Sequence, residues 1–234
     1  IIKETKINYS NENNDLLKEQ NKTLQEQINE LNNDKKNGGV GNFPLIVTCD
    51  RQTKGVDRKG NKWICKEGSL AFTLVSEVSL PASKSNRMVL AAQVTSANTL
   101  KALTGKTFHL KWPNEIWNEK EKVGGVLDEV FVSGNRTKWI NLGVGINIVN
   151  EFSRKDFLKT FLVMYQDIES KALKYPEILI AEWNYYCSDI NKNVKNSADG
   201  FQGIFTGVDD SGFCLIKNSS GDLKRLTPGE SYLL

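Results

Sequence analysis

The chain has little of the material from which metal sites and disulfide frameworks are built. Its 234 residues contain one histidine and four cysteines, and no two cysteines form a Cys-x-x-Cys pair. A structural zinc site needs four such ligands at short spacings, so no structural metal is expected. Scattered cysteines with mostly apolar neighbours are typical of thiols that stay reduced, so we expect a cytoplasmic protein.

Two further absences narrow the classes of function. No apolar run is long enough to cross a bilayer, so no membrane partner is expected. The net charge is only +3, whereas nucleic-acid binding needs a concentrated basic face. The stretch before the central motifs also leaves no room for a helix-turn-helix, so we expect no nucleic-acid partner. The content of 39% hydrophobic and 25% charged residues is that of an ordinary globular chain.

The residues that carry chemistry gather in one segment, 111–129, which reads KWPNEIWNEKEKVGGVLDE. A strand predicted over 108–112 ends at Pro113, because proline has no N–H for the sheet. An apolar, β-branched run resumes over 123–132 and predicts a second strand. The two adjacent glycines in this run would let a ligand lie against the backbone. We therefore expect a hairpin that gathers four polar side chains: Lys111, Asn114, Glu115 and Lys122.

This segment resembles the signature of biotin protein ligases, Lys-Trp-Pro-Asn-Asp followed by Lys-x-x-Gly-Ile-Leu-x-Glu. Glu115 stands where that family has aspartate. The upstream sequence QTKGVDRKGNKW, residues 52–63, is similar to the family's loop Gln-Thr-x-Gly-Arg-Gly-Arg-x-Gly-(Arg or Asn)-x-Trp. Val56 replaces a basic residue there and Asp57 replaces a glycine. Downstream, GVGIN at 143–147 is similar to the family's Gly-(Ile or Val)-Gly-Ile-Asn element.

The resemblance implies a two-step reaction. Biotin attacks the α-phosphorus of MgATP to give biotinoyl-5′-adenylate and pyrophosphate. A lysine of a biotin carboxyl carrier domain, part of a biotin-dependent carboxylase, then takes the biotin and releases AMP. ATP, Mg²⁺ and biotin are thus the implied small molecules, and the chain is expected as a monomer or a homodimer.

The same resemblance assigns residues to roles. The catalytic group would be Lys122, Arg58 and Lys111. The biotin site would be formed by Gln52, Gly55, Lys122, Gly124, Gly125, Leu127 and Gly143. The ATP and adenylate site would be formed by Arg58, Asn61, Trp63, Asn114 and Asn147. Glu115 would orient Mg²⁺ or the acceptor lysine.

Two other functions remain open. A lipoate or octanoate ligase or transferase shares the fold implied by the resemblance. A catalytically weakened homologue that only binds biotin or its adenylate is suggested by Val56, Asp57 and Glu115. A poor match to the family's Ser-Thr-Asn segment, at 11–13, points the same way.

The expected fold is α+β, with a central mixed β-sheet flanked by helices and a small C-terminal SH3-like β-barrel. Periodic apolar residues predict a helix over 84–103, with Ser83 as N-cap and Gly105 as its stop. Further helices are predicted over 157–175 and 177–187. Three regions are expected: an N-terminal helix (about 13–31) with a polar insertion in 1–42, the ligase domain in 43–196, and the β domain in 197–234.

Overall fold

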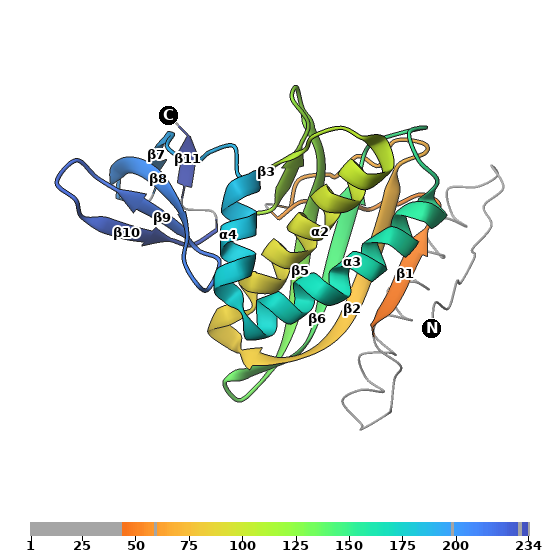
Figure 1. Ribbon diagram of the computed structural model, residues 1–234, viewed down its shortest axis with the longest axis horizontal. Coiled ribbons are helices and arrows are strands. Elements are labelled where there is room, and N and C mark those ends of the chain that lie inside the picture. The colour runs from red at the N-terminus through yellow and green to blue at the C-terminus, as the bar shows by residue number, and fades with distance from the viewer. Residues whose placement is uncertain (1–43, 59, 198, 229–230, 234) are drawn as a thin grey trace.

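The computed structural model describes residues 44–58, 60–197, 199–228 and 231–233. The predicted N-terminal helix, the insertion after it and the 11–13 segment lie outside these residues. Figure 1 shows a large sheet with helices across it and a smaller sheet at the C-terminal end. The expected α+β class is therefore confirmed.

The main sheet has six strands in the order β1-β2-β6-β5-β4-β3. Every neighbouring pair in this order is antiparallel, and a single parallel bridge joins Leu110 to Cys187 beside it. The strands are β1 (Leu45–Cys49), β2 (Leu70–Pro81), β3 (His109–Lys111), β4 (Glu115–Trp117), β5 (Lys122–Ser133) and β6 (Arg136–Ile146).

The helices are η1 (Ala82–Lys84), α2 (Asn86–Thr104), α3 (Arg154–Lys174) and α4 (Pro176–Tyr186). The prediction of Ser83 as N-cap of α2 is wrong, because a short 3₁₀ turn contains Ser83 and the helix begins after Ser85. The Ser85 hydroxyl accepts no bond from the first turn and instead donates to the carbonyl oxygen of Ala82. The stop at Gly105 is confirmed, since its left-handed φ of 70° ends the helix.

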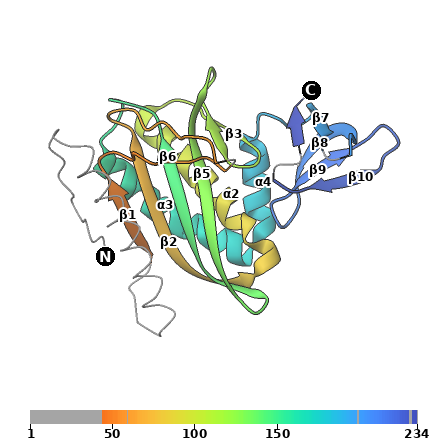
Figure 2. The ribbon, with the colours of Figure 1, turned by 180° about the vertical axis from the view of Figure 1, so that it is seen from behind.

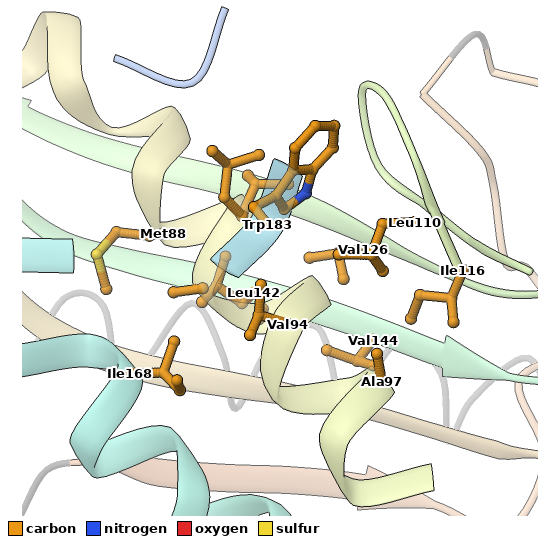
Figure 3. Close-up of a cluster of buried hydrophobic side chains, with 14 of the residues drawn as sticks. Met88, Val94, Ala97, Leu110, Ile116, Val126, Leu142, Val144, Ile168 and Trp183 are labelled. Atoms are coloured by element: carbon orange, nitrogen blue, oxygen red, sulfur yellow. The ribbon is translucent and has the colours of Figure 1, made fainter. Parts of the chain in front are cut away.

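The helices cover only one face of the main sheet, as the view from behind in Figure 2 makes clear. Strand residues alternate between the two faces, so every second side chain points at the helices. Figure 3 shows this core. It includes the buried residues Met88, Val94, Ala97, Leu110, Ile116, Val126, Leu142, Val144, Ile168 and Trp183. The remaining strand positions face away from the helices, and these positions carry the candidate site.

A second antiparallel sheet forms at the C-terminal end, with the order β10-β9-β8-β7-β11. It is consistent with the expected SH3-like unit, although the pairings seen in the described part of the chain do not close it into a barrel. Its strands are β7 (Asn193–Asn196), β8 (Gln202–Val208), β9 (Cys214–Lys217), β10 (Leu223–Leu226) and β11 (Ser231–Leu233). The predicted domain boundaries stay predictions.

Candidate functional site

A row of small residues crosses the centre of the main sheet on the face away from the helices. Glu115 in β4 pairs with Gly125 in β5, which pairs in turn with Gly145 in β6. Directly paired residues of an antiparallel sheet point to the same face, so this row forms a shallow floor beside the Glu115 side chain. Gly143 pairs with Leu127 one step further along the same face.

Gly124 lies on the opposite face from this floor. A Cβ atom added there would come within 2.8 Å of the Gly145 carbonyl oxygen and of the Ile146 side chain. Its lack of a side chain therefore serves close packing toward the helices. Of the two adjacent glycines singled out in the sequence, Gly125 faces the floor and Gly124 could offer a ligand only its backbone.

Three charged side chains of the predicted hairpin do meet at the edge of this floor. The Lys122 Nζ atom donates to Glu115 Oε1 at 2.8 Å, and Trp117 Nε1 donates to Glu115 Oε2 at 2.8 Å. The Lys111 Nζ atom lies 3.6 Å from the centre of the Trp117 ring, a cation–π contact. Two ammonium groups thus surround one carboxylate, which leaves the cluster with a net positive charge.

The Lys122–Glu115 pair is only partly covered. The two side chains are 29% and 30% exposed, so an anion arriving at the floor can reach the ammonium group without unfolding anything. The Lys122 Nζ atom also lies 5.5 Å from the Trp63 ring centre, and it is within 4.0 Å of a Cβ atom built on Gly125. The cluster therefore borders both the floor and an aromatic ring.

Asn114 braces the hairpin. Its side-chain Nδ2 donates to the Val126 carbonyl oxygen at 2.7 Å, and its own carbonyl accepts from the Val126 N–H at 2.9 Å. These two bonds fix the turn between β3 and β4 onto β5. The structure thus gives Asn114 a framework role, and its predicted adenylate contact stays a prediction.

The loop between β1 and β2 crosses β6 and β5 on the side away from the helices (Figure 2). Val56 and Lys62 form an isolated antiparallel bridge, and the Trp63 N–H donates to the Gly55 carbonyl at 2.8 Å. The Asp57 carboxylate accepts from the backbone N–H and the side-chain amide of Asn61, at 2.8 and 3.0 Å. The loop is consequently a tight hairpin closed by its own side chains.

This hairpin places two predicted residues. Gln52 packs against Gly55, where an added Cβ atom would lie 2.9 Å from Gln52 Oε1. Asn61 directs its amide to Asp57. The aspartate that departs from the family's glycine therefore has a structural task, because it caps the turn.

Trp63 lies flat against the floor. An added Cβ atom on Gly145 would come within 3.0 Å of three atoms of the Trp63 indole, so only a glycine lets the ring sit this close. Nearby, the side-chain Nδ2 of Asn147 donates to the Ile64 carbonyl at 3.1 Å. Its Oδ1 atom is buried and has no hydrogen-bond partner among the described residues. An acceptor of this kind suits a ligand that carries an N–H group, such as an adenine amine.

Arg58 lies in a partly buried, acidic setting. Burial lowers the pKa of its guanidinium, and the carboxylates of Asp128 and Asp57 oppose that change by stabilising the charged form. Burial raises the pKa of the Asp128 carboxyl, which Arg58 counteracts. The structure thus associates Arg58 with two carboxylates, and a phosphate would have to compete with them.

Several residues that shape the site lie outside the motifs named above. Trp117 carried a usable signal, since it stands two positions after Glu115 in a strand and so shares its face. Asp50 and Arg154 had none, because they are 104 residues apart; their side chains pair at 3.0 Å and tie the start of the loop to α3. In the described ranges no three His, Cys, Asp or Glu side chains are placed to bind a metal ion. No helix found there has the length and apolar character needed to cross a membrane.

Sequence comparisons with known proteins point to a single family. Residues 15–147 match the model of the biotin/lipoate A/B protein ligase family. The bifunctional ligase/repressor BirA of Bacillus subtilis is 25% identical over 205 residues, which cover 75% of this chain and 62% of that protein. The human biotin–protein ligase is 26% identical over 221 residues, which cover 80% of this chain and 30% of that one. The chain thus spans less than two thirds of the length of these relatives.

A solved structure shares the fold. The biotin protein ligase from Aquifex aeolicus, in complex with biotin and ATP, superposes with a TM-score of 0.65 at 25% identity. The superposition covers 83% of this chain and 90% of that one. It therefore covers more of this chain than the segment that the family model matches.

Proposed function

The chain belongs to the biotin/lipoate A/B protein ligase family, and from this premise we propose that it is a biotin protein ligase. It activates biotin with MgATP to biotinoyl-5′-adenylate and releases pyrophosphate. It then passes the biotin to a lysine of a biotin carboxyl carrier domain and releases AMP. The relatives of this chain are named as biotin ligases, and we extend that activity to this chain.

One observation supports the proposal: the accessible ammonium group of Lys122 lies beside the glycine floor and near the Trp63 ring. Lys122 borders Gly125, and Trp63 lies on Gly145. Joining a carboxylate to a phosphate requires that two anions be held together, and a nearby cation lowers that repulsion. The flat floor lets the acid lie against the backbone, while the indole offers a surface on which a base can stack.

The roles follow from position. Lys122 acts on the reacting carboxylate and α-phosphate, and Lys111 adds positive charge from the other side of Glu115. Arg58 binds phosphate oxygens from the loop, and the Asn147 acceptor faces the adenine amine. The acid lies over a surface formed by Gln52, Gly55, Gly125, Leu127 and Gly143, with the backbone of Gly124.

Mg²⁺ would enter bound to ATP and supply charge neutralisation at the phosphates. Such ions are commonly held by one or two carboxylates together with the nucleotide. Each Glu115 oxygen accepts one hydrogen bond, which leaves further lone pairs on both. Glu115 therefore fits the part of a single protein ligand and would not retain the ion without ATP.

A second candidate is a homologue that binds biotin or its adenylate but turns over weakly. Val56 supports this alternative, because it is 55% exposed on the loop where the family has a basic residue. Without that charge the loop has less hold on an anionic intermediate. A lipoate or octanoate ligase is a third candidate, since the family includes such enzymes.

The test is pyrophosphate release with ATP and biotin, lipoate or octanoate, in the presence and absence of a carrier domain. We expect release with biotin, and transfer of biotin to the carrier only when its target lysine is present. A carrier in which arginine replaces that lysine is the matched control. Pyrophosphate release with lipoate but not with biotin would identify a lipoate ligase instead. Biotin binding without pyrophosphate release would support the weakened homologue.

A further inference from the structure

The turn between β8 and β9, residues 209–213, reaches out of the small sheet and contacts the catalytic part of the chain. The Gly212 carbonyl oxygen accepts from Trp112 Nε1 at 3.1 Å and from Asn86 Nδ2 at 2.5 Å. Trp112 is the neighbour of Lys111, at the start of the charged cluster. One carbonyl of the small sheet therefore holds the segment that carries the candidate catalytic groups.

Ion pairs reinforce this contact. The Asp210 carboxylate pairs with Lys84 Nζ at 2.6 Å and with the Arg87 guanidinium at 3.5 Å. Arg87 is buried, and its Nε atom donates to the Asp210 carbonyl oxygen. A buried guanidinium with several partners costs much more to detach than an exposed surface pair.

The turn itself is rigid. The Asp209 carboxylate accepts from the N–H groups of Ser211 and Phe213, at 2.8 and 2.9 Å, and so closes the turn on itself. Gly212 has a φ of +83°, which favours glycine, and an added Cβ atom would lie 2.7 Å from Asn86 Nδ2. The carbonyl that faces Trp112 thus has little freedom to move.

A second brace acts on the same hairpin from the helix side. Gln93 in α2 is fully buried, and its Nε2 atom donates to the Glu115 carbonyl at 3.2 Å. Trp183 Nε1 holds Gln93 in turn, by donating to its Oε1 atom at 3.1 Å. The turn of the β3–β4 hairpin is therefore held by α2, through Gln93, and by the small sheet, through Gly212.

We propose that the 209–213 turn is a positioning element for the first half-reaction: it sets Trp112 and thereby the placement of Lys111 and Glu115 next to Lys122. The inference rests on the proposed function and adds a task for the small sheet. No group of the turn touches the reacting atoms. Its effect passes through Trp112, and misplacement of catalytic groups by about 1 Å can cost as much as a hundredfold in rate.

The test compares Asp210→Asn and Trp112→Phe with Asp222→Asn. Asp222 lies in the β9–β10 turn of the same sheet, where its carboxylate accepts from Asn218 Nδ2 at 2.9 Å, and among the described residues it makes no hydrogen bond to the main sheet or its helices. We expect both positioning variants to lower kcat for pyrophosphate release about tenfold, with KM for the acid changed less than twofold. Asp210→Glu should recover most of the rate, and Asp222→Asn should keep it.

Combining the two substitutions adds a sharper criterion. If the turn acts through Trp112, the double variant should be no slower than the slower single one, because both changes break one chain of contacts. Fully multiplicative losses, or an equal loss in Asp222→Asn, would overturn the inference. So would unchanged kcat in both positioning variants.

Hydrogen exchange separates this inference from the proposed function. Amides of β3 and β4 should exchange faster in Asp210→Asn than in Asp222→Asn, whatever the protein catalyses. If the wild type releases no pyrophosphate but the two variants differ in exchange, the ligase function is refuted and the positioning contact is supported. If the wild type is active but both variants exchange identically, the ligase function is supported and the positioning contact is refuted.

Discussion

Replacement of Lys122 by alanine separates what this residue does for the fold from what it does for the chemistry. In the free protein Lys122 pairs with Glu115 at 2.8 Å, and both side chains are about 30% exposed. Pairs of this exposure contribute about 1 kcal/mol or less to stability. Glu115 keeps its bond from Trp117 in the variant, so the melting temperature should fall only slightly.

The expected loss of rate is far larger. In the proposed reaction, Lys122 is the cation closest to the glycine floor, where the carboxylate and the α-phosphate meet. Removal of one preorganised group that stabilises developing charge typically costs about 10²–10³ in kcat. A drop of this size, at nearly unchanged stability, is the result expected for the loss of a catalytic charge.

The assay is pyrophosphate release with saturating ATP and biotin, alongside thermal unfolding of each variant. Lys120→Ala is the matched control, because Lys120 lies in the turn just before Lys122 and is exposed. It should keep its rate within about twofold, as is normal for a surface change. Lys122→Arg should recover part of the activity, since it keeps the charge but replaces a compact ammonium by a broad fork. Full activity in Lys122→Ala would refute the assignment of this cluster as the reaction centre.

Three further predictions concern the loop, the floor and the turn. Gly145→Ala should raise KM for ATP, because the new methyl group would lie 3.0 Å from three atoms of the Trp63 indole and push the ring away; an unchanged KM would show that the ring does not take part in nucleotide binding. Asp57→Gly should speed hydrogen exchange in the 55–63 loop and the escape of bound adenylate, since the loop loses its side-chain cap; equal exchange would show that the backbone bridge suffices. Lys84 lowers the pKa of the Asp210 carboxyl. The contribution of this ion pair to stability is therefore complete above the ordinary pKa near 3.8 and is lost as pH falls through the lowered value. The stability difference between wild type and Asp210→Asn should therefore be constant from pH 7 to about pH 4 and shrink below it, which thermal unfolding from pH 7 to pH 2 would measure.

The sequence predicted most of what depends on local pattern. Apolar periodicity located α2 to within two residues, and Pro113 marked the end of the first predicted strand; the short strand β4, which lies between the two predicted strands, was not expected. The Lys122–Glu115 pair depends on a register shift: Gly124 pairs with Ile116 but Lys122 pairs with Trp117, so an irregularity that strand alternation alone does not predict brings Lys122 to the face of Glu115. The start of α2 was missed, since a hydroxyl at Ser83 and one at Ser85 look equally suitable as caps until the 3₁₀ turn is seen.

Contacts over long separations could not be predicted from local pattern. Trp112 and Gly212 are 100 residues apart, and nothing in the composition of the 209–213 turn shows that it faces the catalytic part. The side chains of β7 are mostly polar, a local composition that favours a connecting loop over a strand. Its pairing with β8 and β11, together with the burial of Val194 and Asn196, overrides that local preference.

The residues that depart from the family pattern make specific contacts, which argues against a loss of function. Glu115 has one more methylene than the family's aspartate, and its two oxygens reach Trp117 and Lys122 at the same time, each at 2.8 Å. A shorter arm on the same backbone could not easily span both donors. The longer carboxylate therefore links Lys122 to Trp117, the ring against which the Lys111 ammonium group lies. Glu115→Asp should consequently leave one of the two ammonium groups less well placed, so that the family's usual residue lowers the rate in this particular chain.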